Sequence, residues 1–331
     1  MYIKVDSVNT KPDKKIFKTL DEQIEIMISK GLTITDYEYT RNVLLRENYF
    51  FLNGYRHMFM VSDVNRTFIK GSTFDELYAV FNFDRRLRNI LFKNILIFEN
   101  NIKSILSYVV SKNHGFKEKN YLNINNFVKD SSRYRQINDL IRKMKRQIRV
   151  NGRQHTATSH YLNKYGYVPL WVAVKVLSFG IVGELYTILQ YKDQEEIAEI
   201  FNIDIHNLID YLPIIANYRN LCAHEDICYE NKTQKFIDDT KYHTMLFIPK
   251  KNGEYIYGKN DLFALIIILK QLLDELDFTM MIREISYELE MLCGKLHSID
   301  INKVLMTMGF PVNYKEILRL KWWKKRKVIM Y

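Results

Sequence analysis

The sequence predicts an all-α protein, and three observations support that fold class. The 331 residues include only 12 Gly and 5 Pro, fewer than a turn-rich β protein requires. Hydrophobic residues make up 47% of the chain, which is enough for a packed core. Apolar residues recur mostly at helical spacing. We therefore expect one composite, mostly helical domain over residues 1–331.

Each expected helix follows from that periodicity. The helices are expected at residues 20–30, 36–48, 74–112, 133–149 and 193–202, from Asp204 or Asp210 to about Ala223, at 261–278 and 280–296, and from Pro169 onward, where proline favours a first helical turn. A loop is expected over residues 151–167. A small β-hairpin is expected over residues 243–258, where two apolar segments flank KKNGE.

No internal repeat and no shift in composition marks a linker, and the single domain is expected to have three parts. An N-terminal helical extension is expected over residues 1–72, a helical core over 73–296 and a basic tail over 297–331. In the tail, Trp322, Trp323 and the following KKRK could stack on bases or contact phosphates. They could equally dock the tail on the body of the protein.

The sequence predicts a soluble, cytoplasmic protein that does not enter membranes. The N-terminal segment MYIKVDSVNTKPDKK lacks the apolar region of a secretory signal. The longest apolar run, Leu262 to Leu269, has eight residues, whereas a bilayer core requires about 20. Three cysteines give no even framework for disulfides, which fits a reducing compartment.

The net charge of +11 and a pI near 9.2 favour a polyanionic partner, either nucleic acid or an acidic membrane surface. The densest basic stretch is the helix expected at 133–149. Its cations, which we predict to contact RNA phosphates, are Arg133, Arg135, Arg142, Lys143, Lys145, Arg146 and Arg149. The alternative is an ordinary solvated helix face.

The candidate catalytic residues are Arg219, Asn220 and His224, in the motif YRNLCAH. Spacing alone is not informative, because Arg149 with His155 and Arg153 with His160 are spaced similarly. Those two pairs fall in the polar segment RVNGRQHTATSH. Only the third pair closes a helix with a clear apolar stripe.

Helical geometry relates these three side chains to one another. Asn220 and His224 lie about 40° apart on adjacent turns, so Asn220 could orient the imidazole. Arg219 continues the apolar stripe and therefore requires a buried anionic partner or a groove. Glu99, followed by Lys103 at the i+4 position, is the candidate partner. The alternative for Glu99 and Lys103 is a solvated surface pair.

Other residues have simpler interpretations. Cys222, His224 and Cys228 suggest zinc, but no fourth ligand is evident nearby, and Cys222 lies on the apolar stripe. We therefore expect buried thiols and no metal. The core and tight helix packing are expected to include Pro169, Trp171, Phe179 and Gly180.

Several segments together resemble the AbiD/AbiF-like abortive-infection family of the HEPN superfamily. They are FKTLDEQIEIMISKGLTITD, ENYFFLNGYRHMF, FDELYAVFNFDRRLRNILFKNILIFEN, HYLNKYGYVPLWVAVKVLSFGIVGELY and RNLCAH. Their order and spacing agree with the family over about residues 16–230. After His224 the chain departs from it, since EDICYEN lacks the expected basic, Trp-containing stretch.

The resemblance implies a HEPN-like helical bundle and a two-fold dimer with endoribonuclease activity. It implies Arg219, Asn220 and His224 as catalytic residues, Glu99 and Lys103 as their support, and a place for His160 in the cleft, although an ordinary loop histidine is the alternative there. RNA is the expected partner, as substrate and as a small structured RNA, and no cofactor is expected. The other interpretations are a catalytically silent protein that holds a structured RNA, or an interaction scaffold on a degenerate fold.

Overall fold

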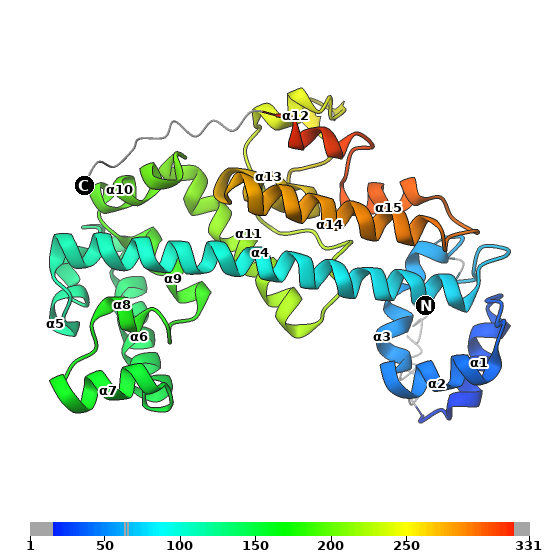
Figure 1. The fold of residues 1–331 in the computed structure, drawn as a ribbon, viewed down its shortest axis with the longest axis horizontal. Helices are drawn as coiled ribbons and strands as arrows, with labels where there is room; N and C mark the ends of the chain where they lie inside the picture. Colours follow the sequence, from blue (N-terminus) through cyan, green and yellow to red (C-terminus); the bar gives the residue numbers. More distant parts are fainter. Residues whose placement is uncertain (1–15, 63, 65, 321–331) are drawn as a thin grey trace, which may run out of the picture. The chain divides into compact units, whose positions relative to one another are not determined.

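The computed structural model describes residues 16–62, 64 and 66–320 (Figure 1). Of the described residues, 68% are helical, and their sheet has only two short strands. This confirms the all-α fold class.

The chain divides into two compact units. One comprises the described residues up to Phe81 together with His297–Ile299, and the other comprises Asn82–Leu296 and the described residues from Asp300 onward. The long helix α4, Phe74–His114, begins in the first unit and continues into the second (Figure 1, cyan). The predicted boundaries at residues 72/73 and 296/297 stay predictions.

The first unit is built from short capped helices. They are α1 Leu20–Ser29, α2 Tyr37–Glu47, α3 Tyr49–Asn53, the 3-10 helix η1 Gly54–Phe59 and the start of α4. Thr19 and Glu22 form a capping box at the start of α1. Glu76, in the first turn of α4, is buried and accepts hydrogen bonds from the backbone N–H groups of His297 and Ser298 (2.7 and 2.6 Å).

The second unit holds the remaining elements. These are α5 Glu118–Tyr121, η2 Ile124–Asn126, η3 Ser131–Arg133, α6 Tyr134–Gln154, α7 Thr156–Tyr165, α8 Leu170–Ala173, α9 Phe179–Ile188, α10 Tyr191–Phe201, α11 Ile205–His224, α12 Lys241–Met245, β1 Lys250–Lys251, β2 Glu254–Tyr255, α13 Leu262–Leu272, α14 Glu275–Cys293, α15 Ile301–Met308 and η4 Tyr314–Leu318.

Two sets of helix contacts organise the second unit. Helix α9 packs against both α6 and α11, and α13 packs against both α11 and α14. Helix α13 is apolar on all sides, and each residue from Leu262 to Leu269 is fully buried. Such a helix forms only where neighbours cover it completely, so α13 lies at the centre of the core.

Most predicted helices are confirmed within one to three residues, but three local predictions are wrong. The expected loop at 151–167 is largely helical, because α6 continues to Gln154 and α7 follows it. The predicted break between the helices at 261–278 and 280–296 instead falls at Leu273–Asp274. A hairpin does lie within residues 243–258, but its strands are Lys250–Lys251 and Glu254–Tyr255, almost entirely within the predicted turn KKNGE, while residues 241–245, which overlap the first apolar segment, form α12.

Of the four residues predicted to lie in the core, two are buried and two are exposed. Pro169 and Phe179 are buried as expected. Trp171 is 47% exposed and Gly180 is exposed, with nothing close to the position of an added Cβ. The core assignment is therefore wrong for those two residues.

The predicted tail contains an unexpected helix, α15. Trp322 and Trp323 lie outside the described residues, so their two interpretations stay open. Among the described helices, none combines the length and the apolar character that a membrane span requires.

Candidate active site

Helix α11 carries the YRNLCAH motif at its C-terminal end. Its inner face consists of buried side chains, namely Leu208, Tyr211, Leu212, Ile214, Ile215, Tyr218 and Cys222. The helix ends at His224 because Glu225 adopts a left-handed backbone (φ 58°) and its N–H caps the carbonyl of Leu221. His224 thus occupies the last turn, with its side chain exposed to solvent.

Arg219 is held against α4 by the side chains of Glu99 and Phe92. Its Nε lies 3.3 Å from Oε2 of Glu99, and its guanidinium carbon lies 5.7 Å from the centre of the Phe92 ring. Oε1 of Glu99 accepts from Nζ of Lys103 at 2.7 Å. The Glu99 side chain is 7% exposed and that of Arg219 is 31% exposed. The arginine is therefore held by residues of α4 on its buried side, while part of its side chain is still exposed to solvent.

This arrangement resolves the two sequence-based alternatives for Glu99. A solvated surface pair is wrong, because Glu99 is buried and Lys103 is only 12% exposed. Glu99 instead bridges two cations that are 4 and 120 residues away in sequence. The chemical roles of these residues stay predictions.

Asn220 and His224 are both exposed on the outer face of α11. In the part of the chain that the structure describes, no hydrogen bond joins them. The proposed orientation of the imidazole by Asn220 therefore stays a prediction. The exposure of both groups leaves them accessible to a bound molecule.

A second ion pair on α4 holds the segment that follows His224. Asp84 and Arg88, one turn apart, form a fully buried pair. The Asp84 carboxylate accepts from the backbone N–H groups of Cys228 and Tyr229, at 3.1 and 2.8 Å. Arg88 donates to the carbonyl oxygen of Asp226 at 3.4 Å. The chain after the motif is thus fastened to the same helix that anchors Arg219.

Asp84 and Arg88 were not predicted as part of the site, although the sequence carries a signal for them. Both lie on the buried side of α4, and their acid–base spacing of four residues repeats that of Glu99 and Lys103. A charged pair on an apolar stripe must be satisfied by other buried groups. In this chain those groups are backbone amides.

The cysteines beside the motif are buried thiols, as expected. Cys228 is fully buried and Cys222 nearly so, whereas His224 is exposed. A hydrogen bond with Cys222, together with burial, raises the pKa of the Cys228 thiol well above its usual value. Among the described residues, no group of three or more His, Cys, Asp or Glu side chains is placed to hold a metal ion.

The predicted basic surface is present on α6 and the turn before it. Every one of its cations is exposed, namely Arg133, Arg135, Arg142, Lys143, Lys145, Arg146 and Arg149. Some of them pair with carboxylates, for example Lys143 with Glu184 and Arg149 with Glu118. Of the set, Arg135, Lys145 and Arg146 have no carboxylate within ion-pair distance in the described part of the chain.

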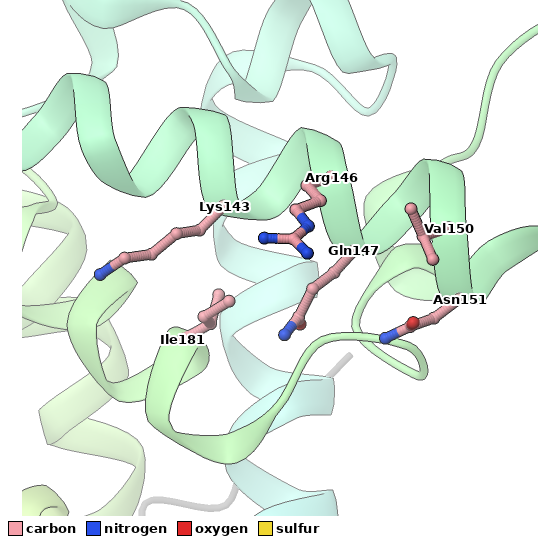
Figure 2. Close-up of a pocket in the computed structure, with 6 residues that line it drawn as sticks. All are labelled: Lys143, Arg146, Gln147, Val150, Asn151 and Ile181. Atoms are coloured by element: carbon pink, nitrogen blue, oxygen red, sulfur yellow. The ribbon is translucent and has the colours of Figure 1, made fainter.

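A hollow of about 360 Å³ lies where α6 meets α9. Figure 2 shows Lys143, Arg146 and Gln147 projecting from α6 beside Ile181 of α9. Gln147 also accepts from the backbone N–H of Ser178 at 2.9 Å, which fixes the rim of the hollow. The basic surface of α6 therefore includes a concave region that is lined by two cations, Lys143 and Arg146.

His160 was expected in a loop, but it lies on α7, where it is exposed. Its ring contacts those of Tyr161 and Tyr165. No contact joins it to Arg219 or His224 among the described residues. Its place in the catalytic cleft stays a prediction.

Comparison with known families gives a match to the Abi-like protein model over residues 42–230. The chain belongs to the Abi-like protein family. The matched region contains Glu99 and the whole YRNLCAH motif, and membership in the Abi-like family supports abortive infection as the setting in which the chain acts. The comparisons with curated proteins and with solved structures gave no match.

Proposed function

We propose that this Abi-like protein is a metal-independent endoribonuclease of the HEPN type that acts in abortive infection. The observation that supports this most directly is the anchoring of Arg219 by buried Glu99, beside an exposed His224 on the same helix end. Five residues of helix separate the two side chains by about 7.5 Å along the axis. The two positions also lie about 140° apart around the helix, so the proposal requires the long Arg219 side chain to bend toward His224 for one phosphodiester group to contact both.

The chemistry requires only proton transfer and charge stabilisation. The 2′-hydroxyl oxygen of the RNA attacks the adjacent phosphorus while its proton passes to a histidine. The new O2′–P bond forms as the P–O5′ bond breaks, and the leaving oxygen takes up a proton. Histidine suits both transfers near neutral pH, and a guanidinium matches the charge and geometry of the phosphate. The products are a 2′,3′-cyclic phosphate and a 5′-hydroxyl.

Glu99 and Lys103 serve as positioning residues in this scheme. Glu99 holds the Nε side of Arg219, which leaves the terminal nitrogens for phosphate. Lys103 neutralises the second oxygen of Glu99. Asp84 and Arg88 fix the chain that follows the motif and thereby the end of α11.

We further propose that two chains form the complete site. In-line transesterification requires an acid and a base, and each motif supplies one histidine. A two-fold axis through the cleft would bring two copies of His224 to one phosphate. The exposure of Asn220 and His224 is compatible with such an interface.

The test compares wild type with His224→Ala on total RNA in the presence of EDTA. His206→Ala is the matched control, because His206 lies on the same helix and is 71% exposed. We expect His224→Ala to lower cleavage by about 10²–10⁴-fold without unfolding the chain, and the control to cut normally. Product ends should carry the cyclic phosphate. Equal cutting by wild type and His224→Ala would exclude His224 as the catalyst.

A second candidate function is the holding of a structured RNA without cleavage. The exposed cations of α6 and the hollow beside them support this second function, because they could bind phosphates without any contribution from His224. It predicts that wild type never cuts, even after any bound inhibitor is removed, while RNA stays bound in a salt-sensitive manner.

A further inference from the structure

Six aromatic rings form a continuous chain of contacts in the second unit. We call them the aromatic strip, and they are His160, Tyr161, Tyr165, Tyr167, Phe116 and Trp171. Successive centroids lie 5.3 to 6.4 Å apart. The rings come from α7, from α8 and from the loops that precede α5 and α8, elements that lie close together in Figure 1.

The strip is a surface feature. Tyr165 is 49% exposed, Trp171 is 47% exposed and Phe116 is 37% exposed. Large aromatic side chains of a core are fully buried, as Tyr121 is only a few residues away. Adjacent rings that stay half exposed leave apolar faces available to a ligand.

The backbone beneath the strip is held by several hydrogen bonds, of which the one from Tyr121 is buried. The carbonyl of Phe116 accepts from the N–H of Leu170 at 3.2 Å, and the hydroxyl of Tyr121 donates to the carbonyl of Val168 at 3.0 Å. Glu118 accepts from the N–H of Val168 and from Arg149, each at 3.1 Å. The rings are therefore positioned before any ligand arrives, which reduces the entropy cost of binding.

Cations accompany the rings. Nζ of Lys117 lies 4.9 Å from the centre of the Tyr167 ring, and Nζ of Lys164 lies 5.3 Å from that of Tyr165. Residues 140–183, which include α7, α8 and most of α6, contain eight Lys or Arg residues and no Asp or Glu. Helix α7 packs directly on α6. The strip thus continues the basic surface.

We propose that the aromatic strip stacks the unpaired bases of single-stranded RNA while Lys117, Lys164 and the cations of α6 contact its phosphates. Flat rings combined with cations suit a strand whose base faces are open and whose backbone is anionic. A duplex hides those faces, and a protein partner would not require so one-sided a charge. The proposal rests on the proposed function in taking RNA as the ligand, but it assigns binding to residues outside the cutting motif.

The experiment uses the full chain carrying His224→Ala, with EDTA present, so that binding is measured without cleavage. The probe is a labelled, unstructured RNA of roughly 12 nucleotides, within the usual range of single-strand sites. An abasic strand of the same length and a duplex serve as comparison ligands. The variants are Tyr165→Leu and Trp171→Leu, which remove a ring, and Tyr165→Phe and Trp171→Phe, which keep one. Tyr287→Leu, an exposed tyrosine of α14, is the matched control.

We expect each Leu variant to bind the single strand about 5- to 100-fold more weakly. The Phe variants and the control should bind as the parent does. Affinity for the abasic strand should be low and the same for all variants, because only phosphates remain to be contacted. Unchanged binding of the single strand by both Leu variants would overturn the proposal. The exposed rings would then be assigned to binding a protein partner. Equal weakening for the abasic strand would also overturn it, because the rings would then not act by stacking.

The two proposals fail in different ways. If the strip binds RNA but wild type does not cut, the endonuclease is wrong and the strip stands. If wild type cuts in a His224-dependent manner and the Leu variants bind normally, the strip is wrong and the endonuclease stands.

Discussion

Oε2 of Glu99 lies 3.3 Å from Nε of Arg219, although 120 residues separate them in the sequence. The pair joins α4 to the end of α11, and both oxygens of Glu99 are used, since Oε1 contacts Lys103. Because Glu99 is buried, its carboxylate cannot be replaced by water without rearrangement. Among the contacts of Arg219, Glu99 therefore supplies the charged one, beside the packing of the guanidinium over Phe92.

Glu99→Gln should lower the rate of RNA cleavage by about 10- to 100-fold, the usual cost of misplacing a catalytic group. The amide keeps the shape of the side chain but loses the charge that holds two cations. Initial rates under EDTA provide the measurement. Glu284→Gln, which disrupts the ion pair with Lys93, is the control and should cut normally. A Glu99→Gln protein that is fully active would remove Glu99 from the site.

Asp84→Asn should destabilise the second unit by about 3–5 kcal/mol, because it removes the carboxylate that forms an ion pair with the buried guanidinium of Arg88. Denaturant unfolding measures the loss. The double variant Asp84→Asn with Arg88→Met should recover part of it, since the buried guanidinium is then removed as well. A double variant less stable than the single one would contradict this explanation.

Reversing the charge of Lys145 and Arg146 should weaken RNA binding and flatten its dependence on salt. Neither side chain has a carboxylate partner among the described residues, so both are available to phosphates. Each lost phosphate contact should reduce the slope of log K against log salt by about 0.7 for a single strand. Arg283→Glu, an exposed site on α14, is the control. An unchanged slope would indicate that α6 is an ordinary solvated face.

Glu76→Gln should destabilise the first unit at neutral pH by about 1–3 kcal/mol. Burial raises the pKa of Glu76, but hydrogen bonds from Ser298, His297 and Thr73 outweigh it, so the pKa in the folded chain lies below its usual value. The ionised carboxylate therefore stabilises the fold above pH of about 4.3, its unfolded value. That stability is lost as the pH falls through the lower folded value.

Thermal unfolding at several pH values tests this prediction. The difference between wild type and Glu76→Gln should be largest at pH 7 and should shrink as the solution is acidified. A difference that is independent of pH would show that Glu76 contributes by shape alone.

Periodicity was sufficient to predict most of the helices, and the exceptions have identifiable causes. Helix α7 buries only Thr158, so its sequence carries almost no apolar period. Gly152 looks like a break but lies inside α6, where an added Cβ would come within 2.6 Å of Cγ2 of Thr158. Close helix packing requires the glycine there. Helix α13 is apolar on all sides, so the spacing of its apolar residues could not indicate where the helix ends.

The candidate site was predictable to the extent that it depends on spacing within a helix. Arg219 on an apolar stripe requires an anion, and Glu99 was the candidate. The contacts of Asp84 could not be predicted, because its partners are backbone amides whose positions depend on the path of the chain after His224. The exposure of Trp171 was also beyond the sequence, since an aromatic residue after proline packs inward or outward according to its neighbours.

The burial of α13 has a consequence for how the protein is made. A ribosome synthesises residues 262–272 before α14, which packs directly on them, so a nascent chain exposes the run Leu262–Leu269 until its cover has emerged. Eight consecutive apolar residues without charge or proline form an aggregation-prone segment. Chains that stall after α13 are therefore expected to be held by chaperones or degraded, and only those that continue through α14 can bury the segment.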